Sequence, residues 1–67
     1  MEEFADVLKQ LRVEKGFNRE QLAKALGVSY SIVRYWEDGV KIPRLDMARH
    51  IAKYFGVSID ELAGEKH

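Results

Sequence analysis

The sequence predicts an all-α chain of five short helices in 67 residues. Each of its five glycines follows an amphipathic stretch, and a glycine just past a helix favours the left-handed conformation that ends it. Residues that start helices precede these stretches, and no segment alternates polar and apolar residues for long enough to predict a strand. The five glycines are Gly16, Gly27, Gly39, Gly56 and Gly64.

Capping residues mark the start of three of the expected helices. Asn18 followed three residues later by Gln21 has the spacing of a capping box, in which each side chain bonds the other residue's backbone N–H. Ser29 can cap the next helix, although isoleucine occupies the position where a complete box needs Glu or Gln. Ser58 followed by Glu61 repeats the full box near the end of the chain.

These signals place the helices and their inner faces in order along the chain. Pro43, the sole proline, is expected at the entry to the fourth helix, because its fixed φ suits a first turn. The expected ranges are 2–15, 19–26, 30–38, 44–55 and 59–63. Spacings of three and four residues predict inner faces that consist of Phe4, Leu8, Leu11, Leu22, Ala23, Leu26, Val33, Trp36, Leu45, Ala48, Ile51, Ala52, Phe55, Ile59 and Leu62.

Composition predicts one domain, residues 1–67, that is soluble and cytoplasmic. There is no cysteine, no apolar run approaches a membrane span, and the acidic N-terminus does not resemble a signal peptide. We expect no enzymatic activity, cofactor or metal. His50 has no second histidine or suitably spaced carboxylate, and Ser29 and Ser31 have no nearby His and Asp to activate them.

Charge is unevenly distributed in a chain whose formal net charge is zero. From Arg19 to Lys53 there are seven Lys or Arg and four Asp or Glu, whereas the two ends together have four basic and seven acidic residues. Random scatter can produce counts this small. A locally basic surface nevertheless attracts phosphate even in a neutral protein, because salt screens the distant charges.

The second and third helices have the spacing of a helix-turn-helix, over about residues 18–38. Gly27, Val28 and Ser29 form the connection, and a three-residue turn with glycine joins two helices at a steep angle. With Val33 and Trp36 turned inward, the other face of the third helix is exposed. In this motif the second helix enters the major groove of DNA.

The segment from about Leu8 to Leu62 resembles the lambda-repressor-like family, also called the XRE family of helix-turn-helix regulators. The resemblance rests on the Leu22-Ala23 pair, Gly27 in the turn, apolar Val33 and Trp36, Trp-Glu-Asp-Gly at 36–39, Pro43, and Ile-Ala in the fourth helix. It implies a compact five-helix DNA-binding domain, which is expected to be nucleoid-associated when bound to DNA.

The resemblance also implies roles for individual residues. Base-contacting positions fall on Tyr30, Ser31, Arg34 and Tyr35, and phosphate-contacting positions on Asn18, Arg19, Ser29, Lys41 and Arg44. Arg12 and Glu37 match a pair that holds the first helix to the third. Two positions depart from the family, which often has glutamine where this chain has Arg19 and Tyr30. In the family, the glutamine at the Arg19 position braces the start of the third helix, and the glutamine at the Tyr30 position contacts adenine. These two roles therefore do not carry over to this chain. Among the exposed residues of the third helix, only Arg34 has the planar group that contacts guanine bidentately.

The expected function is sequence-specific binding of double-stranded DNA by a transcriptional repressor or similar regulator. One recognition helix contacts few base pairs, so a homodimer on a palindromic operator is expected, at least on DNA. With the chain ending soon after the fifth helix, dimer contacts are expected from that helix, the end of the fourth, or assembly on DNA. The alternative is a protein-interaction module, either an adaptor or an antitoxin with the same fold.

Overall fold

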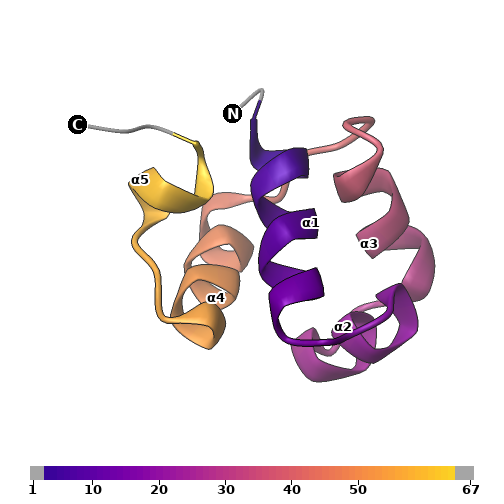
Figure 1. Cartoon of the computed structure of the whole chain (residues 1–67). Helices are drawn as coiled ribbons and strands as arrows, with labels where there is room; N and C mark the ends of the chain where they lie inside the picture. The colour runs from indigo at the N-terminus through magenta and orange to yellow at the C-terminus, as the bar shows by residue number, and fades with distance from the viewer. Residues whose placement is uncertain (1–2, 65–67) are drawn as a thin grey trace.

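The computed structural model describes residues 3–64, which form five α-helices and no strand (Figure 1). The helices are α1 (Phe4–Glu14), α2 (Arg19–Leu26), α3 (Tyr30–Glu37), α4 (Leu45–Phe55) and α5 (Ile59–Leu62). The expected ranges agree with these bounds to within one or two residues, which is the usual uncertainty of a helix end. Residue 2, where the first helix was expected to begin, lies outside the described residues.

The helix ends contain the cap hydrogen bonds that the sequence predicts. Asn18 Oδ1 accepts from the backbone N–H of Gln21, and Gln21 Oε1 accepts from that of Asn18, both at 2.8 Å. Ser58 and Glu61 form the second capping box, at 3.0 and 3.3 Å. Ser29 Oγ accepts from the N–H three residues on, at 3.3 Å. All five glycines have positive φ, between 70° and 81°.

The start of α4 differs from the expectation in two respects. Arg44 is the N-cap, with extended backbone (ψ 163°), so the helix begins one residue later than expected, and the buried Pro43 precedes the N-cap at the entry to the helix. The inward placement of Leu45 is wrong, because this residue is 60% exposed. Helical side chains tilt toward the N-terminus, so a first-turn residue projects over the preceding chain and beyond the neighbouring helices.

The core is formed by side chains from all five helices. Phe4 and Trp36 meet edge to face, with ring centroids 6.3 Å apart, and this contact joins α1 to α3. Three residues that were expected to face inward are only partly buried, at the margin of the core: Leu11, Phe55 and Ile59. The buried apolar residues are Phe4, Leu8, Leu22, Ala23, Leu26, Val33, Trp36, Ala48, Ile51, Ala52 and Leu62.

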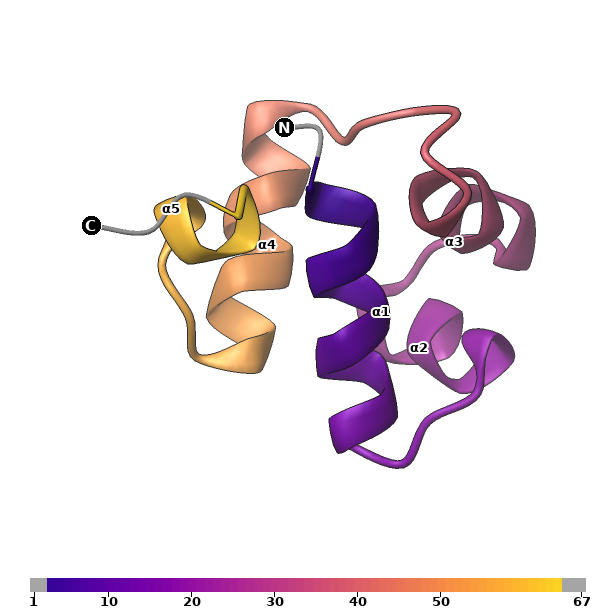
Figure 2. The same cartoon turned by 45° about the horizontal axis from the view of Figure 1, so that its top comes forward.

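α1 lies between two groups of helices, with α2 and α3 on one side and α4 and α5 on the other (Figures 1 and 2). The two groups also meet directly. His50 of α4 is exposed, as expected, but its Nε2 lies 3.2 Å from the carbonyl oxygen of Leu26 at the end of α2. No helix in residues 3–64 is long and apolar enough to cross a membrane.

Candidate nucleic-acid interface

α3 has one buried face and one exposed face. Val33 and Trp36 are almost wholly buried against the core. The four predicted base-contacting residues are all exposed, and two of them are large aromatic side chains, Tyr30 at 45% and Tyr35 at 40% exposure. The structure therefore places Tyr30, Ser31, Arg34 and Tyr35 on the surface of one helix.

Glu37, at the end of α3, is held by two arginines. Arg12 of α1 donates from Nε to Oε2 at 2.7 Å and from Nη2 to Oε1 at 3.1 Å. Its Nη1 donates to the carbonyl oxygen of Phe17 at 2.8 Å. The Glu37 side chain is fully buried, and that of Arg12 is 13% exposed. A buried carboxylate needs such partners, because an unpaired buried charge is costly.

Arg19, at the start of α2, is the second partner of Glu37, and sequence reasoning missed this contact. Its Nε donates to Glu37 Oε1 at 3.1 Å, and its side chain is 30% exposed. The hydrogen bond to Glu37 raises the pKa of Arg19 above its ordinary value, and the Tyr30 side chain adds to this rise. One arginine therefore joins the start of α2 to the end of α3. In the sequence, Arg19 is one of several cations that could pair with Glu37, and the sequence does not specify which of them does so.

The cluster of Arg12, Arg19 and Glu37 keeps a net positive charge, since two cations surround one anion. A shallow hollow beside it is lined by Arg12, Asn18, Arg19, Glu20 and Tyr30. Asn18 and Ser29 use a side-chain oxygen in helix capping. The Asn18 amide and the Ser29 hydroxyl are also donors, and donation does not require the capping oxygen's accepting lone pair.

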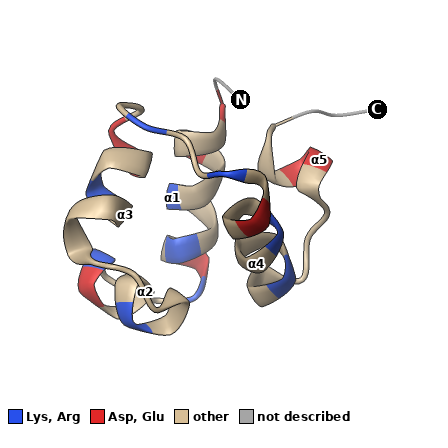
Figure 3. Cartoon of the chain, turned by 180° about the vertical axis from the view of Figure 1, so that it is seen from behind, with Lys and Arg blue, Asp and Glu red and all other residues tan. Residues whose placement is uncertain are grey.

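The connection from α3 to α4 contributes two further exposed cations, Lys41 and Arg44 (Figure 3). The carbonyl oxygen of Tyr35 accepts from the N–H groups of Val40 and Lys41, at 2.9 and 3.3 Å, which holds the connection against the end of α3. Lys41 Nζ lies 5.2 Å from the centroid of the Tyr35 ring, within the range of a cation–π contact. Arg44 makes no side-chain cap hydrogen bond.

Arg34 lies close to one acidic residue of its own helix end. Its Nε is 3.6 Å from Asp38 Oδ2, and the two side chains are 59% and 43% exposed. Exposed pairs of this kind contribute about 0–1 kcal/mol. Arg34 can therefore exchange Asp38 for another acceptor at little cost.

Residues 3–64 contain no group of three or more His, Cys, Asp or Glu side chains that could hold a metal ion. What the surface around α3 provides is a set of donors and aromatic faces. Arginine, lysine, serine and asparagine donors suit phosphate and base edges, and the tyrosines suit apolar contact with bases.

Comparison with known proteins gives one family model that covers most of the chain. The model, described as helix-turn-helix, matches residues 8–62. No solved structure matches the chain significantly.

Three curated relatives are similar over most of this chain. The HTH-type transcriptional activator BcrR of Enterococcus faecalis is 43% identical over 96% of this chain and 32% of its own length. The cryptic phage CTXphi transcriptional repressor RstR of Vibrio cholerae is 34% identical over 92% of this chain and 56% of its own. An uncharacterised HTH-type transcriptional regulator of Methanocaldococcus jannaschii is 42% identical over 82% of this chain and 83% of its own. The chain thus spans about a third of the length of BcrR and about half of the length of RstR.

Proposed function

This chain belongs to the helix-turn-helix family of lambda-repressor-like, or XRE, regulators, and from that membership we propose that it binds double-stranded DNA sequence-specifically and regulates transcription. The observation that carries the proposal is the exposed face of α3. Two tyrosines and an arginine lie on that face although the opposite face already completes the core. Such a helix suits the major groove, where base edges and thymine methyl groups are accessible.

Base contacts are assigned to the exposed face of α3. Arg34 can donate two hydrogen bonds to guanine O6 and N7, which is the commonest specific contact in the major groove. Tyr30 and Tyr35 offer apolar surface to a thymine methyl group and a hydroxyl to bases or phosphate. Ser31 is short, so it contacts a base only where the helix lies deep in the groove.

Phosphate contacts are assigned to residues on either side of α3. Arg19, Asn18 and Ser29 lie at the starts of α2 and α3, where unpaired backbone N–H groups also attract phosphate. Lys41 and Arg44 lie on the connection that follows α3. In this arrangement Glu37 positions Arg19 by accepting a hydrogen bond from its Nε. The remaining N–H donors of the Arg19 guanidinium, on Nη1 and Nη2, are the ones assigned to phosphate.

A homodimer on a palindromic operator is part of the proposal. Half-sites one helical turn apart are separated by about 34 Å. The folded chain measures 32 × 23 × 20 Å, so one copy fits within each turn and two copies come close only along their longest dimension. In that arrangement, a contact between the two copies on DNA is small.

Membership of the family does not specify whether the protein activates or represses transcription. One relative is named an activator and another a repressor. Repression follows where the bound site overlaps the promoter, and activation requires a further contact with the transcription machinery. A DNA partner also places the protein with the DNA, which in bacterial and archaeal cells is in the cytoplasm.

The experiment that tests this function is selection of bound sequences from random duplex DNA. Enrichment of a palindrome with half-sites about 10 base pairs apart is expected. Recovery of no preferred sequence contradicts the proposal. Affinity capture from a lysate, with and without nuclease, tests the alternative. Protein partners that survive nuclease, together with no DNA preference, favour an adaptor or antitoxin.

A further inference from the structure

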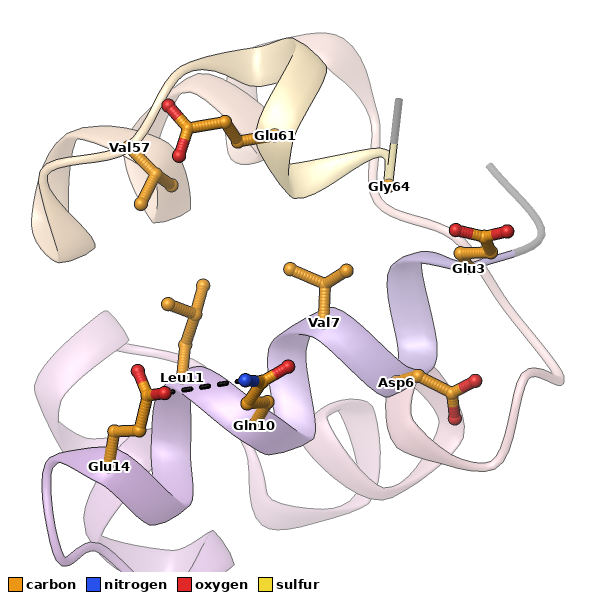
Figure 4. A pocket seen from close by; sticks show the side chains of 9 residues that line it. All are labelled: Glu3, Asp6, Val7, Gln10, Leu11, Glu14, Val57, Glu61 and Gly64. Carbon is orange, nitrogen blue, oxygen red and sulfur yellow. Dashed lines mark hydrogen bonds between the residues drawn. The ribbon is translucent and has the colours of Figure 1, made fainter. Parts of the chain in front are cut away.

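A groove of about 580 Å³ lies between α1 and α5 (Figure 4). α5 and α3 lie on opposite sides of α1 (Figure 1). Val7 and Leu11 point into it from α1, and Val57 points into it from the opposite wall (Figure 4). All three are partly exposed and pack against the core below. The floor of the groove is therefore apolar and continuous with the protein interior.

Among the described residues, the rim of this groove carries negative charge and no positive charge. Glu3, Asp6 and Glu14 line it from α1 and the residue before it, Glu61 lines it from α5, and no Lys or Arg within residues 3–64 contributes to the lining. Within residues 3–64, none of these four carboxylates forms an ion pair. Glu14 accepts a hydrogen bond from Gln10, at 3.4 Å. Glu61 accepts from the backbone N–H of Ser58 in the capping box, at 3.3 Å. Four like charges around an apolar floor, with no ion pair to them within residues 3–64, favour a cationic, amphipathic occupant.

One end of the groove is closed by a close approach of the chain to the start of α1. Gly64 has φ +81°, and a Cβ at this position would lie 2.5 Å from Cβ of Glu3. The rest of the groove follows α1 from Glu3 to Glu14. α1 has 11 residues, which at 1.5 Å per residue extends for roughly 16 Å. A helical segment of about three turns has the same length.

The charges of the groove exclude two simple occupants. DNA phosphate is repelled by four carboxylates. Two copies of this chain that met groove to groove would bring eight such groups together around the shared apolar surface. A helix with lysines or arginines beside an apolar stripe instead satisfies both the floor and the rim, in the helix-in-groove mode of recognition.

We propose that the α1–α5 groove binds an amphipathic helix with a basic polar face, supplied by a protein partner. Apolar side chains at positions i, i+3 or i+4 and i+7 of that helix occupy the floor beside Val7, Leu11 and Val57. Its cations lie against the carboxylates of the rim. α1 separates the groove from α3, and none of the predicted DNA-contacting residues lines the groove.

A synthetic peptide tests this proposal directly. The probe is a labelled peptide of about four helical turns, with leucines at i, i+3, i+4 and i+7 and lysines at the other positions. A scrambled peptide of the same composition controls for net charge. Binding is measured by fluorescence anisotropy, and backbone amide NMR shifts locate the site. The designed peptide is expected to bind more tightly than the scrambled one and to shift amides of α1 and α5 and leave those of α3 unchanged.

A pair of double variants separates the groove from overall charge. Asp6→Asn with Glu14→Gln removes two rim charges, and the matched control, Glu20→Gln with Asp46→Asn, removes two exposed charges elsewhere. The groove variant is expected to bind the designed peptide about threefold to tenfold more weakly, the effect of two exposed ion pairs, and the control less than twofold more weakly. Glu14→Gln alone serves if the double variant is less well folded.

Four results would overturn the proposal. Equal weakening by the two double variants, or equal binding of the two peptides, would show a response to net charge alone. Amide shifts on α3 in place of α1 and α5 would move the site. Self-association that the groove variant abolishes, without any peptide binding, would identify a second copy as the occupant. The DNA selection described above is unaffected by each of these results, so the two proposals fail separately.

Discussion

Arg12 and Glu37, 25 positions apart, are joined by two hydrogen bonds, Nε to Oε2 at 2.7 Å and Nη2 to Oε1 at 3.1 Å. This bidentate geometry fixes the end of α1 to the end of α3. The same Oε1 also accepts from Arg19, so one buried carboxylate connects α1, α2 and α3. The exposed face of α3 is thereby held in a defined orientation relative to both neighbouring helices.

Replacing Arg12 by alanine is expected to lower the free energy of unfolding by about 1–3 kcal/mol, because Glu37 loses two hydrogen bonds while it stays buried. Arg19 keeps its bond to Glu37 and limits the loss. Replacing both Arg12 and Glu37 by Leu or Met is expected to recover part of the stability, since no buried charge is then left. Thermal and urea unfolding measure the effect. An unchanged melting temperature for Arg12→Ala would mean that the pair does not stabilise the fold.

Arg34→Ala and Arg19→Ala are expected to affect DNA binding in different ways. Arg34→Ala should reduce the preference for one base pair in each half-site by about 1–3 kcal/mol. Arg19→Ala should weaken binding to all sequences alike and make the salt slope shallower by about one per monomer. It should also cost up to about 1 kcal/mol of stability, because Arg19 is a partly exposed partner of Glu37.

The measurement compares both variants on the selected site and on its single-base mutants at two salt concentrations. Circular dichroism checks that each variant keeps the parent helix content. If Arg34→Ala weakens every sequence equally, Arg34 contacts phosphate, and specificity passes to Tyr30, Ser31 and Tyr35.

The salt dependence of DNA binding is expected to be moderate. With about three or four phosphates neutralised per monomer, a dimer should show a slope of about −5 to −7 in a plot of log affinity against log salt concentration. Titrations at several salt concentrations on the selected site provide the slope. A slope near zero is incompatible with the proposed contacts of Arg19, Lys41 and Arg44.

Two apolar residues of α4 are expected to respond very differently to substitution. Leu45→Ser should change stability by no more than about 0.5 kcal/mol, because Leu45 is 60% exposed. Ile51→Ala should cost about 2–5 kcal/mol, because Ile51 is fully buried and its truncation leaves a cavity. Chemical denaturation of both variants gives the comparison. A large loss for Leu45→Ser in the free protein would show that this side chain contributes to the core.

The sequence by itself determined the helices, their ends to within one or two residues, and the exposed face of α3. Caps such as Asn18 with Gln21, and turns such as the one at Gly27, depend on residues close together in the chain, and local spacing describes them completely. The division of α3 into a Trp36 side and a Tyr30 side follows from the helical period in the same way. The DNA-contacting roles of the exposed residues stay predictions.

Only the tertiary structure decided which residues from different helices meet. Nothing in local spacing brings Arg19 to Glu37, His50 to the carbonyl of Leu26, or α5 to the acidic side of α1, because these contacts depend on the angles between helices. The same dependence explains Leu45, which has the spacing of a core residue but lies beyond the helices that could cover it. Periodicity specifies a face of a helix, whereas burial requires a neighbour at the same height along its axis.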